Sequence, residues 1–296
     1  MAEKSKIASI IELTKPRLTA MALFSGAVGF VAGTYDNQDV AWLPFFYTVI
    51  GLAFVGAASN IYNQAMEVEL DRQMKRTEDR PIVEGRVSKT EAYTVGTVCL
   101  IIGYALLFKL LSSLVANLAL ATFLSYVAIY TPMKTKSFLN TIVGAFPGAL
   151  PTFTGFVAAR GLVDYPAFMV FTFLFVWQLP HFFSIASIYK EDYKNAGYKM
   201  MSLYDETGKQ AVALIVVGNL ALIASSYLPM QYIVEKGSVF YCLLATVGNA
   251  AMFILTLLLV KNREKHMKKY FYASIIYLPY ILILLMIFRG LPVTAV

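Results

Sequence analysis

The chain has 296 residues, of which 58% are hydrophobic and 15% charged, and its formal net charge at pH 7 is +7. With a mean hydropathy of +0.62, this composition excludes an ordinary soluble globular protein. The positive charge does not indicate nucleic-acid binding, because the basic residues lie in short blocks between apolar runs rather than on one continuous face. The two cysteines, Cys99 and Cys242, both lie inside apolar runs, which excludes a disulfide framework and favours small buried side chains.

Nine apolar runs approach the length of roughly 20 residues that a helix needs to cross the hydrocarbon layer. Lipid cannot satisfy backbone hydrogen bonds, so each run is predicted to be a helix. The predicted helices span residues 18–34, 40–65, 90–111, 114–130, 140–159, 167–188, 210–228, 239–260 and 270–287. The first resembles the later runs, which favours a retained helix over a cleaved signal peptide.

Lysine and arginine are divided unequally between the segments that connect these helices. Alternate segments, beginning with the N-terminal one, hold 21 of the 25 basic residues; the other four are Lys109, Arg160, Lys236 and Arg289. Because basic segments remain on the cytoplasmic side, we expect a multi-pass protein of the bacterial inner membrane. Its N-terminus is predicted to be cytoplasmic and its C-terminus outside.

Acidic residues gather in two of the basic segments, residues 67–91 and 191–206, which lie four helices apart on the same side of the membrane. This arrangement suggests two related halves with a site between them. We therefore predict a single polytopic domain, residues 1–296, with possible four-helix repeats at about 18–130 and 140–260 and a ninth helix at 270–287.

Asn63, Glu67 and Asp71 stand at the end of the second predicted helix. Their spacing of four places all three on one helix face. Oxygen ligands of this kind suit Mg²⁺ shared with a substrate phosphate. The basic residues that follow are suited to bind the same anion: Arg72, Lys75, Arg76 and Arg80. The alternative is a solvated helix end in which these charges pair with one another. Acidic side chains at the mouth of a membrane helix are costly, which favours the functional interpretation.

A second cluster, Trp177, Gln178 and His181, lies inside the sixth predicted helix. A polar side chain buried there must find a partner or serve a substrate, so we predict that these residues line a substrate cavity together with Asn60. The alternative is a structural histidine. The other histidine, His266, lies in a basic block and is expected to be solvated or to contact lipid headgroups.

Tyr130 and Lys134 lie after the fourth predicted helix, on the cytoplasmic side. Lys134 either meets a diphosphate or extends its ammonium group to the lipid headgroups. The next predicted helix carries four residues that break helices, which is typical of a helix beside a cavity: Gly144, Pro147, Gly148 and Pro151.

Together these motifs resemble the UbiA-type intramembrane prenyltransferases, a nine-helix family with two acidic motifs on the cytoplasmic side, and within it the branch that makes heme O. The resemblance covers essentially the whole chain. It rests on Asn63-x-x-x-Glu67-x-x-x-Asp71, Met74-x-Arg76-Thr77-x-x-Arg80-Pro81, Tyr130-Thr131, Trp177-Gln178-x-Pro180-His181-Phe182 and Asp192-Tyr193-x-x-Ala196-Gly197.

Two positions depart from the wider family. Glu67 stands where the family usually has Asp, so the metal would be held by a longer arm. Ala196 stands where many members have a second Asp, which leaves fewer carboxylates for a second metal but is common in the heme branch.

The resemblance implies an all-α membrane bundle with a central cavity open toward the cytoplasmic side. It implies transfer of a farnesyl group from farnesyl diphosphate to a vinyl group of heme B, with water addition to give heme O. It implies these roles: Asn63, Glu67, Asp71 and Asp192 are catalytic and hold Mg²⁺; Arg72, Lys75, Arg76, Arg80, Tyr130, Lys134 and Lys190 bind the diphosphate; Asn60, Trp177, Gln178 and His181 line the heme cavity. The expected partners are heme B, membrane lipid and possible heme A synthase or oxidase assembly factors.

Three other functions remain open from the sequence. A sibling enzyme of the same family would prenylate a quinone or chlorophyll precursor. A secondary transporter of an anionic substrate would also have broken helices and basic cavities, but it has no need for three oxygen ligands at helical spacing. The third is a non-catalytic heme-handling protein.

Overall fold

The computed structural model describes residues 5–35, 39–234 and 239–290. Within these ranges nine helices are long and apolar enough to cross a membrane, as predicted. Their ends lie close to the predicted ones except at the last helix, which begins at Arg263 rather than at residue 270. The side chain of Asn262 caps this helix by accepting a hydrogen bond from the backbone N–H of Lys265 at 3.0 Å, so the basic segment is helical.

The spans and their connecting elements follow one another along the chain. The spans are α2 (Pro16–Gly33), α3 (Trp42–Met66), α5 (Lys89–Leu110), α6 (Ser113–Leu124) continued by the π-helix η1 (Ser125–Tyr130) and α7 (Thr131–Met133), α8 (Asn140–Arg160), α9 (Tyr165–Ile188), α11 (Lys209–Ser225) with η3 (Leu228–Gln231), α12 (Val239–Lys261) and α13 (Arg263–Ile287). Short elements join them: α1 (Lys6–Leu13), α4 (Val68–Asp71), α10 (Lys190–Asn195) and the 3₁₀ turn η2 (Met201–Leu203).

Helix α8 occupies the centre of the bundle. It is the most buried span, with 67% of its apolar window inside the protein against 17% for α5, and it packs against α2, α6 and α9. Backbones of α2 and α8 touch directly: a Cβ at Gly155 would lie 1.9 Å from the Gly26 carbonyl oxygen, and one at Gly29 would lie 2.0 Å from that of Thr152. Small residues therefore set the spacing of the two central helices, as in other membrane bundles.

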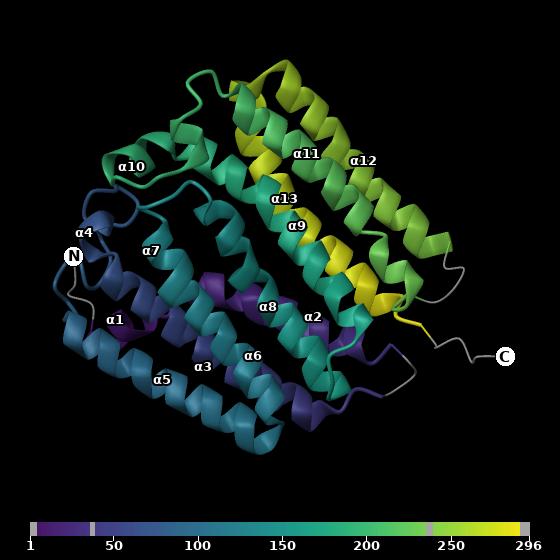
Figure 1. Ribbon diagram of the computed structural model, residues 1–296, viewed down its shortest axis with the longest axis horizontal. Coiled ribbons are helices and arrows are strands. Elements are labelled where there is room, and N and C mark those ends of the chain that lie inside the picture. Colours follow the sequence, from purple (N-terminus) through teal and green to yellow (C-terminus); the bar gives the residue numbers. More distant parts are fainter. Residues whose placement is uncertain (1–4, 36–38, 235–238, 291–296) are drawn as a thin grey trace.

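The connecting elements gather at one end of the bundle. Helices α1, α4 and α10 lie together at the left of Figure 1, beside the C-terminal end of α3. This arrangement brings together the two acidic segments that are far apart in the sequence. The assignment of this end to the cytoplasm stays a prediction.

Candidate active site

The site begins at the junction of α3 and α4, where Asn63, Glu67 and Asp71 lie. Helix α3 ends at Met66, and Glu67 leaves helical geometry with φ −97° and ψ 10° before α4 starts. The backbone pattern is nevertheless kept, because Glu67 N–H donates to the Asn63 carbonyl at 3.0 Å and Asp71 N–H donates to the Glu67 carbonyl at 2.8 Å. The predicted common face is therefore present although the helix is interrupted.

The three side chains are almost completely buried, with exposed fractions of 1%, 4% and 1%. Asn63 Nδ2 donates to Glu67 Oε2 at 2.8 Å and to the Thr131 hydroxyl at 3.2 Å, which ties α3 to the fourth span. The π-helix η1 positions Thr131, whose hydroxyl donates to the Tyr126 carbonyl five residues earlier at 2.9 Å. A π-helical turn of this kind is often found at functional sites.

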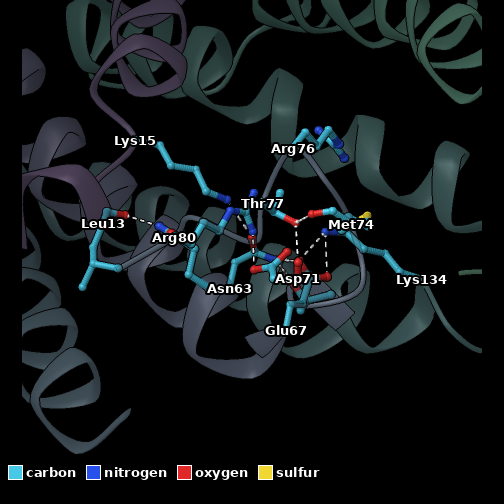
Figure 2. A network of polar contacts seen from close by, with 12 residues as sticks. Leu13, Lys15, Asn63, Glu67, Asp71, Met74, Arg76, Thr77, Arg80 and Lys134 are labelled. Atoms are coloured by element: carbon cyan, nitrogen blue, oxygen red, sulfur yellow. Dashed lines mark hydrogen bonds and ion pairs between the residues drawn. The ribbon is translucent and has the colours of Figure 1, made fainter. Parts of the chain in front are cut away.

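A cation faces each of the three oxygen-bearing side chains (Figure 2). Lys15 Nζ donates to Asn63 Oδ1 at 2.9 Å. Lys134 Nζ lies 2.8 Å from Glu67 Oε1 and donates to Glu67 Oε2 at 3.1 Å. Arg80 forms an ion pair with Asp71. Two carboxylates and an amide are thus enclosed by three basic side chains from three different segments.

The oxygen atoms at this site fit a divalent cation. Glu67 Oε1 and Asp71 Oδ1 are buried and accept no hydrogen bond; Glu67 Oε1 has only its ion pair with Lys134. No group of three His, Cys, Asp or Glu residues that could hold a metal occurs within the described ranges. The available donors are therefore two carboxylates and the Asn63 amide, which suits Mg²⁺ because that ion keeps waters and shares phosphate oxygens.

Burial and charge change the acidity of these groups. Burial raises the pKa of Asp71, and the neighbouring Arg80 opposes this shift. Burial lowers the pKa of Lys15 to about 7, with help from the positive charges of Arg80 and Lys134. Burial also acts to lower the pKa of Lys134, but the Glu67 carboxylate outweighs it and holds that pKa well above its ordinary value. Lys134 is therefore held in its charged form.

Lys15 is the functional candidate that sequence reasoning missed. It is the one described non-glycine residue with positive φ, at +49°, in the bend between α1 and α2. The bend is held by α3: Gln64 Nε2 donates to the Leu13 carbonyl at 2.6 Å, and Asn60 Nδ2 donates to the Thr14 carbonyl at 3.3 Å. The signal in the sequence was a lysine directly before Pro16, because a residue before proline is kept out of the right-handed helical region.

Asn60 has a structural contact with the same bend. Its amide also donates to the Thr19 hydroxyl at 3.0 Å, so it anchors the bend that carries Lys15. That Asn60 lines a cavity together with Trp177 and His181 stays a prediction.

Arg76 connects the two acidic segments. Its Nη2 donates to the Tyr193 hydroxyl at 3.1 Å, and its guanidinium lies 5.3 Å from the ring centroids of both Tyr189 and Tyr193. Met74 is buried beside Tyr193 and Tyr198 in the same small core. The α4 loop thus packs on α10, which carries Asp192. The Asp192 side chain is partly buried and has no hydrogen bond or ion pair to another described residue.

The remaining basic candidates lie away from the carboxylates. Arg72 is exposed and pairs with Glu69 at 2.7 Å, so the charge-pairing alternative describes this residue. Lys75 is exposed, and Lys190 Nζ donates to the Asp205 carbonyl at 2.9 Å. Tyr130 belongs to the site, because the Lys134 ammonium lies 4.7 Å from its ring centroid.

The second predicted cluster is held by α13. The His181 ring stacks between Trp177 at 4.7 Å and Phe271 at 5.2 Å between ring centroids. Ser274 Oγ donates to the Phe271 carbonyl at 2.6 Å, so His181 Nδ1, 2.7 Å from Oγ, must be the donor in that contact. The lone pair of His181 is therefore on Nε2, and no residue in the described part of the chain forms a hydrogen bond with Nε2.

Gln178 connects two helices. Its Nε2 donates to the Ala145 carbonyl at 3.0 Å and to the Leu174 carbonyl at 3.2 Å. The amide lies so close to α8 that a Cβ at Gly148 would be 1.9 Å from Gln178 Oε1. This side chain therefore joins α8 to α9.

Comparison with known proteins agrees with this geometry. The model of the UbiA prenyltransferase family matches residues 22–278. The chain therefore belongs to the UbiA prenyltransferase family, whose members transfer prenyl groups, and it is a multi-pass membrane enzyme.

Relatives in this family carry a more specific name. The chain is 34% identical over 284 residues to "Protoheme IX farnesyltransferase" of Rhodopirellula baltica, covering 93% of this chain and 98% of the relative. It is 33% identical over 292 residues to the protein of the same name from Opitutus terrae, covering 97% of each.

A third relative is longer than this chain. The mitochondrial protoheme IX farnesyltransferase of Arabidopsis thaliana is 32% identical over 269 residues, which are 90% of this chain and 62% of the plant protein. The resemblance seen in the sequence motifs is thus confirmed.

Solved structures share the fold. A digeranylgeranylglyceryl phosphate synthase superposes with a TM-score of 0.78 at 17% identity, covering 96% of this chain and 98% of the other. A UbiA homolog from Archaeoglobus fulgidus bound to DMAPP and Mg²⁺ superposes with a TM-score of 0.67 at 15% identity, covering 94% and 99%. For the residues that the structure describes, the predicted all-α, nine-helix architecture is confirmed.

Proposed function

We propose that this chain transfers a farnesyl group from farnesyl diphosphate to a vinyl group of heme B. The observation that carries the proposal is the buried set of Asn63, Glu67 and Asp71, with two carboxylate oxygens free of hydrogen bonds and a cation at each side chain. A second support is the name of relatives that match this chain over nearly their whole length, protoheme IX farnesyltransferase. The positive-inside count supports a site on the cytoplasmic face of a bacterial inner membrane.

Asn63, Glu67 and Asp71 would hold Mg²⁺, with Asp192 as a further candidate ligand from the adjacent α10. When bound, the metal would supply positive charge to the departing diphosphate. A UbiA homolog of known structure binds Mg²⁺ together with DMAPP, which supports this use of the fold. Lys15, Lys134 and Arg80 contact the side chains of these three residues and so lie next to the position that the metal would occupy.

The same three cations would bind the diphosphate. Each of them lies within ion-pair or hydrogen-bond distance of a candidate metal ligand, so a diphosphate bound beside these ligands would be within their reach. In the reaction the C–O bond of farnesyl diphosphate breaks and the diphosphate leaves with the electron pair. The vinyl carbon bonds to the farnesyl carbon, and water adds to the resulting cation with loss of a proton. The basic side chains stabilise the leaving charge in a buried setting where such contacts are strong.

His181 is proposed to contact heme through Nε2. The hydrogen bond from Nδ1 to Ser274 fixes the tautomer that leaves Nε2 with its lone pair, and the two flanking rings hold the imidazole plane. A neutral imidazole nitrogen is a common ligand of heme iron. Trp177, whose Nε1 donates to the Ser274 carbonyl at 2.9 Å, belongs to the same support.

A product assay tests the proposal. Purified enzyme with Mg²⁺ and farnesyl diphosphate receives heme B or 4-hydroxybenzoate, and products are identified by mass spectrometry. We expect the hydroxyethylfarnesyl product of heme B; prenylated 4-hydroxybenzoate alone would assign the chain to the quinone branch.

Asp71→Asn should abolish turnover while the protein remains inserted. Glu69→Gln is the matched control, because Glu69 is exposed and two residues away. Full activity of Asp71→Asn would refute the metal role.

A further inference from the structure

A groove between α11 and α12 opens on the side of the bundle, away from the carboxylate site. Its volume is about 710 Å³, and it shares no lining residue with that site. Its wall is apolar and comes from both helices: Val212, Ala213, Val216, Val217, Leu259 and Val260. Val217 and Val260 are 66% and 59% exposed. Since these helices are membrane spans, the wall of the groove faces the lipid chains.

The mouth of the groove is polar and is built around Arg263. Arg263 Nη1 donates to the Thr207 carbonyl at 2.6 Å. The guanidinium passes directly over Gly208, where a Cβ would lie 1.2 Å from Nη1, and Gly208 has φ +68°. Position 208 therefore requires glycine for two reasons: the backbone has a positive φ, and a Cβ would collide with the Arg263 guanidinium. Helices α11 and α13 both begin at this mouth, at Lys209 and Arg263.

A second, smaller cavity of about 330 Å³ continues from the same mouth. It shares Gly208, Arg263 and Glu264 with the groove and extends to Lys190 and Lys268. The guanidinium of Arg263 therefore lies at the boundary of two hollows, with apolar walls on one side and charged groups on the other.

The mouth belongs to the most basic short segment of the chain that the proposed reaction does not use. Five basic residues stand within nine positions, against one acid, Glu264: Lys261, Arg263, Lys265, Lys268 and Lys269. None of the five forms an ion pair with another residue in the described ranges. Clusters of this kind next to membrane helices attract anionic lipid headgroups, and helix N-termini favour the same charge.

We propose that this groove binds an anionic glycerophospholipid, with the phosphate at Arg263 and Lys209 and an acyl chain along Val212 and Val216. The charge of the mouth complements a phosphodiester. The apolar wall is open to the bilayer, so an acyl chain can enter from the side without leaving the hydrocarbon layer. A prenyl diphosphate fits less well, because the groove itself has one carboxylate, Glu264. The adjoining cavity adds Asp205 and Glu206, but Asp205 is buried and both its oxygens accept hydrogen bonds, from the Thr207 hydroxyl and from the Ala211 N–H.

Native mass spectrometry of the full chain in detergent tests this assignment. The probes are palmitoyl-oleoyl phosphatidylglycerol and palmitoyl-oleoyl phosphatidylcholine, which have the same acyl chains. We expect one phosphatidylglycerol to be retained about tenfold more tightly than phosphatidylcholine. Arg263→Gln should remove this preference, and Val216→Trp should weaken retention of both lipids by filling the wall. Each variant is compared with the wild type in elution volume and melting temperature to establish that it is folded.

The control is Lys109→Gln on α5, a basic residue at a different place in the bundle. It should retain phosphatidylglycerol like the wild type. Equal retention of the two lipids, or loss of the preference in the control as well, would overturn the proposal. Inorganic phosphate in excess should not displace the lipid, because it lacks the acyl chain. Displacement by equimolar farnesyl diphosphate would also overturn the proposal and assign the groove to a second prenyl diphosphate.

Discussion

Glu67 has two roles in this structure, counter-ion of Lys134 and proposed metal ligand, and one pair of variants separates them. The substitution Glu67→Gln keeps the size of the side chain and an acceptor for Asn63, but it leaves the Lys134 ammonium buried without a counter-charge. Breaking a buried ion pair from one side costs about 3–5 kcal/mol. The Tyr130 ring, 4.7 Å from the ammonium, contacts it in the wild type and in the variant alike, so it does not offset this cost. We therefore expect Glu67→Gln to lower the free energy of unfolding by about 3–5 kcal/mol.

The double variant Glu67→Gln/Lys134→Met removes both charges and should regain most of that stability, because no charge remains unpaired. Turnover should not return, since neither the metal ligand nor the diphosphate contact is restored; we expect a loss of about 100-fold or more in both variants. Stability is measured by reversible unfolding in mixed dodecyl maltoside and SDS micelles, and turnover by product mass spectrometry. A double variant with wild-type turnover would refute the argument, because Glu67 would then serve only as counter-ion to Lys134.

Three further predictions concern other parts of the protein. Burial lowers the pKa of Lys15 to about 7, so the unfolded chain binds this proton more tightly than the folded one, and the free energy of unfolding falls as the pH is lowered from the ordinary titration range of lysine until it levels off below about 7. The difference between the melting temperatures at pH 8 and pH 6 should therefore be smaller in Lys15→Met than in the wild type. An unchanged difference would contradict the lowered pKa. Gly155→Ala places a Cβ 1.9 Å from a carbonyl oxygen of α2, which should lower the free energy of unfolding by about 2 kcal/mol or more in the same unfolding assay. An unchanged free energy of unfolding would show that α2 and α8 can move apart to accept the methyl group. Ser274→Ala removes the acceptor of His181 Nδ1, so the absorption spectrum of added heme should shift while farnesyl diphosphate still binds. An identical heme spectrum in the variant would show that this hydrogen bond has no role in heme binding.

The features predictable from the sequence are those that depend on neighbouring residues. The hydrocarbon thickness sets the length of the apolar runs, so the nine spans followed from hydropathy. The shared face of Asn63, Glu67 and Asp71 followed from a spacing of four, and it persists although α3 ends before Glu67.

Features that depend on distant partners could not be predicted in this way. Asn60 is a polar residue in an apolar run, which signals a partner but not which one, and its partner at Thr14 is 46 residues away. Lys15 enters the site only because that bend is tied to α3. The acceptor of His181, Ser274, lies 93 residues away and has no recognisable motif.

The three cations around the carboxylates have a consequence for the order in which ligands arrive. Free Mg²⁺ would meet the positive charges of Lys15, Lys134 and Arg80, while a diphosphate without metal would meet two carboxylates. Each ligand alone is opposed by half of the site, whereas the two together satisfy both halves. Binding of metal and of prenyl diphosphate should thus be strongly cooperative and reciprocal, each raising the affinity for the other by the same factor. Either ligand on its own would bind weakly, so the prenyl diphosphate would be held and its C–O bond activated only when the metal is bound as well.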